Sequence, residues 1–202
     1  MGLGYKTWAS GDILTAADVM GYLMKQAVIV CTSGTRPGSP DTGMHIYETD
    51  THKMQKWDFG AWKPVCSSRS STITPTLTST GTSPTLGTGS TAIGFYTYFP
   101  DAISYTFFFK FGTSGVAAGT GNYQVSVPVT GATPFGSSLH PAVGTIQLAD
   151  SSSGAFSAGT CYLDAGAGSF LGMVTNSGIV GATVPWTWAA SDYISGSIVY
   201  PV

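Results

Sequence analysis

The chain has 202 residues, enough for one large domain or for a small module joined to a domain of average size. Charged residues make up only 9% of it and the formal net charge is −2, so hydroxyl and amide groups must solvate much of its surface. This weak charge excludes the basic footprint of a nucleic-acid-binding protein, and the 12% of aromatic residues argues against a disordered chain.

No apolar run approaches the roughly 20 residues that span a bilayer. The first residues lack the basic stretch and apolar core of a secretory signal. We therefore expect no membrane insertion and no export signal.

The charges divide the chain into two parts. Thirteen of the eighteen Asp, Glu, Lys and Arg residues lie in 1–71, and a Ser/Thr-rich stretch follows. This change in composition predicts a boundary near residues 66–72, with an N-terminal module at 1–71 and a second domain at 72–202.

A short helix is predicted near the N-terminus. Thr15 has the character of an N-cap, with Asp18 three positions later, which places the helix over about 16–27. A helix this short needs a partner for its apolar stripe, either in its own module or in a neighbouring subunit. We expect the packing contacts of this N-terminal segment to be Trp8, Leu14, Met20, Leu23 and Met24.

The rest of the module is predicted to be β structure. Residues 27–31 have the pattern of a short strand, and a Pro- and Gly-rich loop follows at 34–40. Alternation over 43–50 and again over 53–58 predicts a β-hairpin or small meander at about 43–62, with Met44, Ile46 and Glu48 on one face. Such a unit is too small to be stable alone.

The second part is predicted to be an antiparallel β-sandwich, jelly-roll-like, so the fold class is mainly β. In residues 103–111 every second side chain is a large apolar one, the clearest strand pattern in the sequence. No helix is expected after residue 30. The further predicted strands are 92–99, 122–128, 143–149, 155–163, 169–175 and 193–200.

Motifs that carry chemistry are missing from the sequence. It contains no G-x-S-x-G elbow, no phosphate-binding loop and no H-E-x-x-H zinc motif, and its three histidines lack ligand spacing. Glycoside hydrolysis would need two carboxylates, but Asp101, Asp150, Asp164 and Asp192 all have the context of turns or strand ends. We expect no catalytic residue, no cofactor and no metal, and a protein that is not an enzyme.

Three cysteines, Cys31, Cys66 and Cys161, stand far apart without a C-x-x-C pair. Buried free thiols are the favoured interpretation. A Cys31–Cys66 disulfide within the first module is the alternative if the protein matures in an oxidising compartment.

Trp186 and Trp188 form one further constellation, two indoles on the same side of an extended segment. Paired tryptophans can stack on sugar rings, but they also anchor cores and subunit interfaces. A core or interface role is favoured over glycan contact.

Two N-terminal segments, Tyr5–Val19 and Arg36–Thr51, resemble the start of structural proteins from tailed phages of actinobacteria. The segment Trp57–Trp62 is similar to the W-D-G-x-x-W ending seen there, with Phe59-Gly60 where that pattern has Gly. In the second part, 111–123 and 185–196 also resemble such proteins, which are minor tail proteins, head fibres or capsid decoration proteins.

The resemblance implies a homotrimer whose N-terminal part docks on the particle while the β-domain faces outward. Its expected location is the virion surface, after synthesis in the bacterial cytoplasm, and its expected partners are further copies of itself and the major capsid protein or tail proteins. The alternative is a receptor- or glycan-binding adsorption protein at the tail tip, with a host cell-surface glycan as its ligand.

Overall fold

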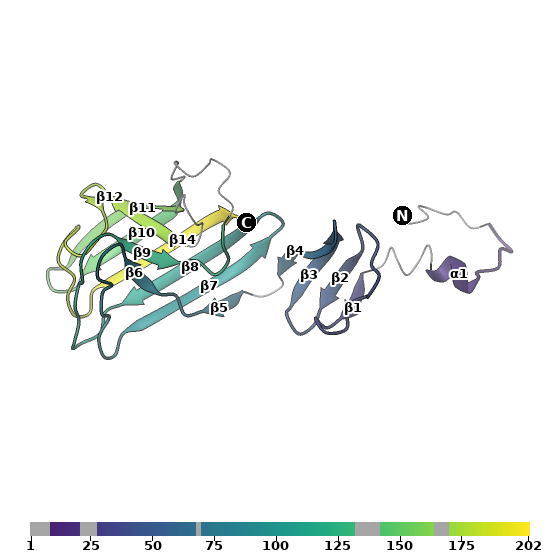
Figure 1. Ribbon diagram of the computed structural model, residues 1–202, viewed down its shortest axis with the longest axis horizontal. Coiled ribbons are helices and arrows are strands. Elements are labelled where there is room, and N and C mark those ends of the chain that lie inside the picture. Colours follow the sequence, from purple (N-terminus) through teal and green to yellow (C-terminus); the bar gives the residue numbers. More distant parts are fainter. Residues whose placement is uncertain (1–8, 21–27, 68–69, 132–141, 164–169) are drawn as a thin grey trace. The chain divides into compact units, whose positions relative to one another are not determined.

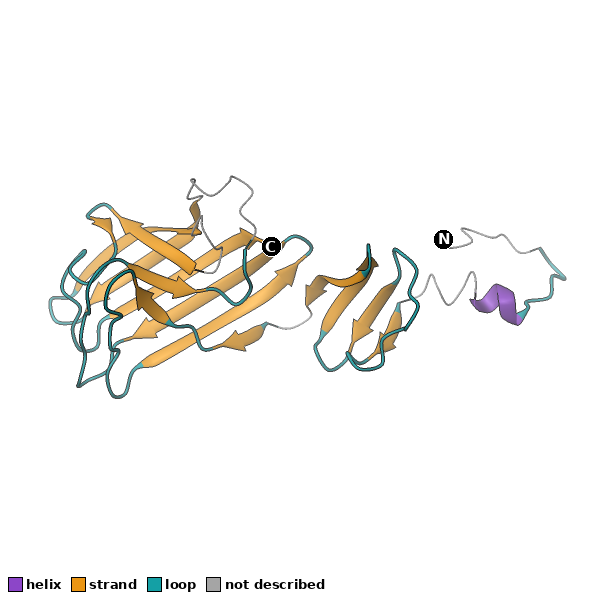
Figure 2. Ribbon diagram, in the orientation of Figure 1, coloured by secondary structure: helices purple, strands orange, loops and turns teal. Residues whose placement is uncertain are grey.

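A computed structural model describes residues 9–20, 28–67, 70–131, 142–163 and 170–202 (Figure 1). The chain forms two compact units. The first comprises Met1–Arg69 with Tyr98–Pro100, and the second comprises Ser70–Thr97 with Asp101–Val202. The prediction of a mainly β fold with a short N-terminal helix is confirmed (Figure 2).

Helix α1 (Ala16–Asp18) begins where the sequence predicts it. Thr15 accepts a hydrogen bond from the Asp18 backbone N–H, and the Asp18 carboxylate accepts one from the Thr15 N–H, which completes the capping box. Helical backbone continues through Val19 and Met20. The remainder of the predicted helix, 21–27, lies outside the described residues.

The first unit contains a four-stranded sheet in the order β1-β2-β3-β4, with β1 at Ile29–Cys31, β2 at His45–Glu48, β3 at Lys53–Asp58 and β4 at Ala61–Ser67. The predicted hairpin is therefore a three-stranded meander. Strand β1 pairs with β2 in parallel, an arrangement that sequence alternation cannot reveal. Met44, Ile46 and Glu48 are buried on one face, as predicted.

A tight turn joins β3 to β4. Asp58 pairs with Ala61, and the two residues between them, Phe59 and Gly60, have φ values of +46° and +89°. Positive φ at both central positions is the requirement of a type I′ turn, which favours Asn-Gly and strains most other residues. Phe59 adopts this conformation with 90% of its side chain exposed.

The second unit is one ten-stranded sheet. Its strand order is β5-β7-β8-β14-β10-β11-β12-β9-β6, with β13 paired to β12. The strands are β5 (Ser71–Ile73), β6 (Leu77–Ser79), β7 (Thr91–Phe99), β8 (Ala102–Lys110), β9 (Tyr123–Ser126), β10 (Ala142–Asp150), β11 (Ala155–Leu163), β12 (Phe170–Thr175), β13 (Gly178–Ile179) and β14 (Tyr193–Pro201).

This sheet curls (Figures 1 and 2) and brings β9 against β8, which gives the predicted sandwich-like arrangement from one continuous sheet. Buried tyrosines join the layers. The Tyr105 hydroxyl on β8 donates to the Ser126 carbonyl on β9 at 3.3 Å. The Tyr200 hydroxyl on β14 donates to the Val129 carbonyl at 3.0 Å. Each phenol thereby buries a large ring while its polar atom stays hydrogen-bonded.

The core consists of the inward side chains of the long strands. Ile103, Tyr105, Phe107 and Phe109 alternate with outward residues along β8, as the sequence predicts, and each is at most 1% exposed. Gly196 on β14 lies directly opposite Phe107. A Cβ there would lie 2.5 Å from the Phe107 ring, so the aromatic ring takes the space that a side chain would fill.

Predicted strands 92–99, 103–111, 143–149, 155–163 and 193–200 match observed strands to within one residue at each end. The short strands β5, β6 and β13 were not predicted. No helix follows residue 30 in the described ranges. The helices described here do not reach the length and apolar character needed to cross a bilayer.

Candidate functional site

The segment around α1 presents apolar side chains to solvent. Ile13 is 84% exposed, Leu14 50% and Met20 61%, and α1 itself buries no residue. Of the five predicted packing contacts, Leu14 and Met20 are thus exposed in the isolated chain, while Trp8, Leu23 and Met24 lie outside the described residues. The exposed side chains provide apolar surface that association with another protein could remove from water.

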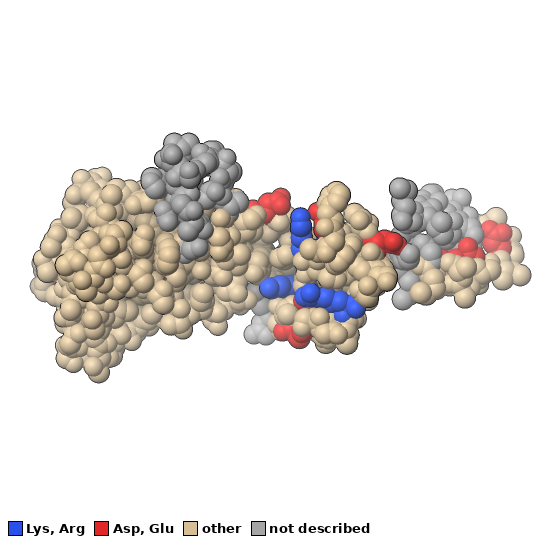
Figure 3. All heavy atoms as spheres, in the orientation of Figure 1, with Lys and Arg blue, Asp and Glu red and all other residues tan. Residues whose placement is uncertain are grey.

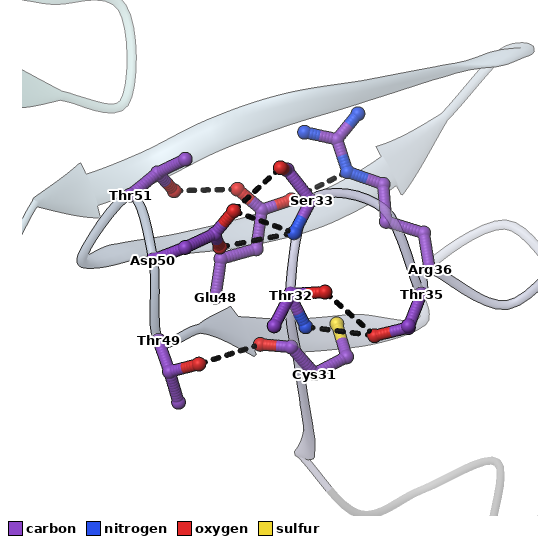
Figure 4. A network of polar contacts seen from close by, with 9 residues as sticks. All are labelled: Cys31, Thr32, Ser33, Thr35, Arg36, Glu48, Thr49, Asp50 and Thr51. Carbon is purple, nitrogen blue, oxygen red and sulfur yellow. Dashed lines mark hydrogen bonds and ion pairs between the residues drawn. The ribbon is translucent and has the colours of Figure 1, made fainter.

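A polar cluster fixes one end of the first sheet (Figure 4). Glu48 is fully buried at the end of β2, where its carboxylate pairs with the Arg36 guanidinium and accepts a 2.5 Å hydrogen bond from the Thr51 hydroxyl. Burial alone would raise the pKa of Glu48, but hydrogen bonds from Arg36, Thr51 and Gln55 outweigh it and lower the pKa below its ordinary value.

The same cluster ties the loop after β1 to the turn after β2. Asp50 accepts hydrogen bonds from the Ser33 N–H at 3.0 Å and from the Ser33 hydroxyl at 2.5 Å (Figure 4). The Ser33 hydroxyl is the main reason that the pKa of Asp50 is lowered. The Thr49 N–H donates to the Cys31 carbonyl at 2.9 Å.

These contacts indicate a structural role for the cluster of Ser33, Arg36, Glu48, Asp50 and Thr51, which we call the clasp. Two carboxylates are held in their ionised form, because the pKa values of Glu48 and Asp50 are lowered. Burial, followed by the nearby Glu48 charge, raises the pKa of the Cys31 thiol, so that thiol stays protonated at neutral pH. None of these three groups is set to exchange a proton near neutrality, as a general acid, a general base or an activated thiol would need to be.

The structure decides between the two cysteine hypotheses in favour of free thiols. Cys31 lies on β1 and Cys66 on β4, the two edges of the four-stranded sheet. Three strand spacings of about 4.8 Å separate them by about 14 Å, twice the roughly 7 Å that a disulfide can bridge. All three cysteines are free. Cys161 is buried as expected and Cys31 is half-buried, whereas Cys66 is exposed, so the prediction of burial was wrong for Cys66 and only partly met for Cys31.

Two carboxylates of the second unit, those of Asp150 and Asp192, accept hydrogen bonds from backbone N–H groups. Asp150 accepts hydrogen bonds from the hydroxyls and N–H groups of Ser152 and Ser153, which lower its pKa to about 2. Asp192 is fully buried and accepts from the N–H groups of Ala189 at 2.8 Å and Ser151 at 2.9 Å. Asp164 lies outside the described residues. Asp150 and Asp192 each stabilise backbone, which is a different task from protonating a glycosidic oxygen.

Across the described ranges, no three His, Cys, Asp or Glu residues gather into a group that could hold a metal ion.

The two tryptophans have different environments in the structure. Trp188 is 3% exposed, stacks on Phe111 with ring centroids 5.3 Å apart and donates from Nε1 to the Gly181 carbonyl at 2.9 Å. Trp186 is half-buried, 5.7 Å from the Trp188 ring, and its buried Nε1 has no hydrogen-bond partner in the described structure. Trp188 is therefore a core residue with no ring face to offer a sugar.

One surface of the second unit was not predicted from the sequence. We call it the outer face: the outward side chains of β7, β8, β14, β10 and β11, five adjacent strands of nine residues each. The register places four hydroxyl residues in one row across it, Thr106, Ser197, Thr145 and Thr160. A shallow hollow of about 270 Å³ lies over three residues of this row, Thr106, Ser197 and Thr145, and is lined also by Gln147 and Ser195.

Aromatic and aliphatic side chains surround the row. Phe108, Tyr193 and Phe156 form a chain of ring contacts at 5.8 and 6.4 Å, and Phe156 is 65% exposed. Alternation within each strand could have shown which residues point outward. Only the strand order shows that they share one surface.

No protein-family model, curated protein or solved structure matches this chain.

Proposed function

We propose that this chain is a non-enzymatic structural protein of a bacteriophage particle, displayed on the virion surface and anchored there through its N-terminal segment. The resemblance of residues 5–19 and 36–51 to phage structural proteins motivates the proposal and implies a homotrimer. The major capsid protein or a tail protein is its proposed docking partner.

The observation that carries the proposal is the exposed apolar surface beside α1. A capped helical turn of this length is marginal in water and needs tertiary packing. Ile13, Leu14 and Met20 nonetheless remain at least half exposed. Docking against another virion protein would bury them at about 25 cal/mol for each Å² of apolar surface removed from water.

The composition of the two units supports a division of labour. Lys, Arg, Asp and Glu gather on the first unit in the view of Figure 3, whereas the second unit shows almost none there. In the second unit, Asp150 and Asp192 are occupied with backbone turns. A β-rich body that depends on hydroxyls and a packed core suits a particle component exposed to changing ionic conditions, because salt screens charge interactions and leaves apolar packing in place.

Attachment to the particle is the direct test. Leu23→Asp places a charge in the predicted apolar stripe and should abolish binding of the purified full chain to particles that lack it, measured by co-sedimentation. Thr183→Asp, an exposed position in the second unit, is the matched control and should bind normally. Normal binding of Leu23→Asp would refute anchoring through this segment.

Copy number distinguishes the two proposed locations. Quantitative mass spectrometry of purified particles should give hundreds of copies for a capsid decoration protein or head fibre, and a few for a minor tail protein. Absence of the chain from purified particles would refute the virion proposal altogether.

The adsorption alternative requires a glycan-binding surface. The buried position of Trp188 removes one of the two tryptophans considered for it. We therefore favour the structural role.

A further inference from the structure

The outer face has the size of a protein interface. Five strands about 4.8 Å apart, each of nine residues rising about 3.3 Å, cover roughly 24 by 30 Å, or about 700 Å². Specific interfaces bury about 800 Å² on each partner. The outer face alone therefore supplies close to the area that a stable association needs.

Its side chains are more apolar than a solvent-facing sheet requires. Ile93 and Phe95 on β7, Val199 on β14 and Phe156 on β11 are between 38% and 65% exposed. They are spread over the face instead of being gathered at the hollow. A partner that covered these side chains would remove their apolar surface from water, which is favourable.

The polar side chains on this face can form hydrogen bonds with the same side chains of another copy. In a symmetric assembly, residues close to the symmetry axis approach the same residues of the other copies, so a charged side chain there would meet its own charge. The central row consists of Thr106, Ser197, Thr145 and Thr160, whose hydroxyls can each donate and accept. The one charged residue on these five strands that points outward, Lys110, stands at the end of β8.

We propose that the outer face of the second unit is the surface through which copies of this chain associate, with the hydroxyl row at the centre of the contact. The inference rests on the oligomeric state included in the proposed function and names the surface responsible for it. A second copy as the partner accounts for three features of the face together: its area, the apolar side chains spread across it and its near absence of charge. A saccharide in the hollow would use only the hydroxyls.

The experiment measures the mass of the full chain in solution by light scattering after size exclusion. We expect the unmodified chain at a multiple of its 20.9 kDa, and Thr145→Lys at 20.9 kDa. Thr145 is exposed at the centre of the row, so each copy would bring a positive charge to the contact. Thr183→Lys, exposed outside this face, is the matched control and should keep the mass of the unmodified chain.

A charge-reversal mixture shows whether loss of assembly is due to misfolding. Thr145→Glu alone should also be monomeric, and mixing it with Thr145→Lys should restore the oligomer, because opposite charges then meet across the contact. Failure of the mixture to assemble would overturn the proposal that this row meets its counterpart in another copy.

The remaining outcomes separate this inference from the proposed function. An oligomer that persists in both Thr145 variants would overturn the outer face as the interface and leave the oligomer itself in place. A monomeric unmodified chain would overturn self-association, and if it binds a neutral oligosaccharide that Thr145→Lys does not, the face is a glycan site instead. Neither result bears on particle attachment, which the Leu23→Asp experiment tests independently.

Discussion

The pairing of Arg36 with the buried Glu48 predicts an asymmetric response to mutation. Arg36→Met removes the only basic partner that the structure describes for Glu48 and leaves its carboxylate buried. Breaking a buried ion pair in this way costs about 3–5 kcal/mol. Because Thr51 and Gln55 still donate to Glu48, and because the Arg36 side chain is 35% exposed, we expect a smaller loss of about 2–3 kcal/mol.

Glu48→Gln should be milder. The amide oxygen can still accept from Thr51, and Arg36 can turn to water from its partly exposed position. We expect a cost of about 1 kcal/mol, in the range of one ordinary hydrogen bond. The double variant Arg36→Met/Glu48→Gln should be close to Glu48→Gln alone, because no buried charge is left unpaired in it.

Hydrogen exchange of the full chain, followed by mass spectrometry, localises the effect. Peptides from β2 and β3 should exchange about 30- to 150-fold faster in Arg36→Met, which corresponds to 2–3 kcal/mol at about 1.4 kcal/mol for each tenfold change. Peptides from β8 in the second unit serve as the internal control and should be unchanged. Equal effects of Arg36→Met and Glu48→Gln would refute the role assigned to the buried charge.

The pH dependence has a definite sign. Since the folded state lowers the pKa of Glu48, its stabilising contribution is complete above the ordinary value of about 4.3 and is lost as the pH falls through the lower folded value. In Arg36→Met the lost charge partner lets burial raise that pKa. The difference in exchange between Arg36→Met and the unmodified chain should therefore narrow as the pH is lowered from 7 to 5, and a constant difference would contradict this account.

Three further changes test the turns and the core by thermal and urea unfolding of the full chain. Phe59→Asn should stabilise the first unit by about 1 kcal/mol, because Asn-Gly suits the positive φ values of the β3–β4 turn; no gain would argue against strain there. Gly196→Ala should destabilise the second unit by about 1–3 kcal/mol as its Cβ meets the Phe107 ring, and an unchanged midpoint would mean that the ring moves freely. Tyr105→Phe should cost about 1 kcal/mol through loss of its hydrogen bond to the Ser126 carbonyl.

Local patterns predicted the elements whose stability is decided locally. The capping box of Thr15 and Asp18 uses residues three positions apart, and the alternation in β8 repeats every two residues, so both are visible without any partner strand. Strands β5 and β6 escaped prediction because each has three residues and lies in a Ser/Thr-rich stretch. Their β structure depends on pairing with β7 and β9, more than 20 residues away in the chain.

Sites that depend on the order of strands could not be predicted. Strand β14 lies between β8 and β10, so its Ser197 joins Thr106 and Thr145 in one row although the three residues are far apart in sequence. The clasp around Glu48 depends on the parallel pairing of β1 with β2, which brings the loop containing Ser33 and Arg36 next to the turn containing Asp50. Neither arrangement follows from the spacing of residues within one strand.

The two units use polar groups in different ways, and the difference bears on assembly. In the first unit, the buried carboxylate of Glu48 has a defined cationic partner within the same chain, so its charge is neutralised locally. On the outer face of the second unit, outward positions near the centre carry hydroxyls such as those of Thr145 and Ser197, which need no partner of opposite charge. A charge at the centre of the proposed contact would face the same charge in an identical copy, whereas a hydroxyl there can both donate and accept. The scarcity of charge on this face is therefore consistent with the self-association that we propose for it.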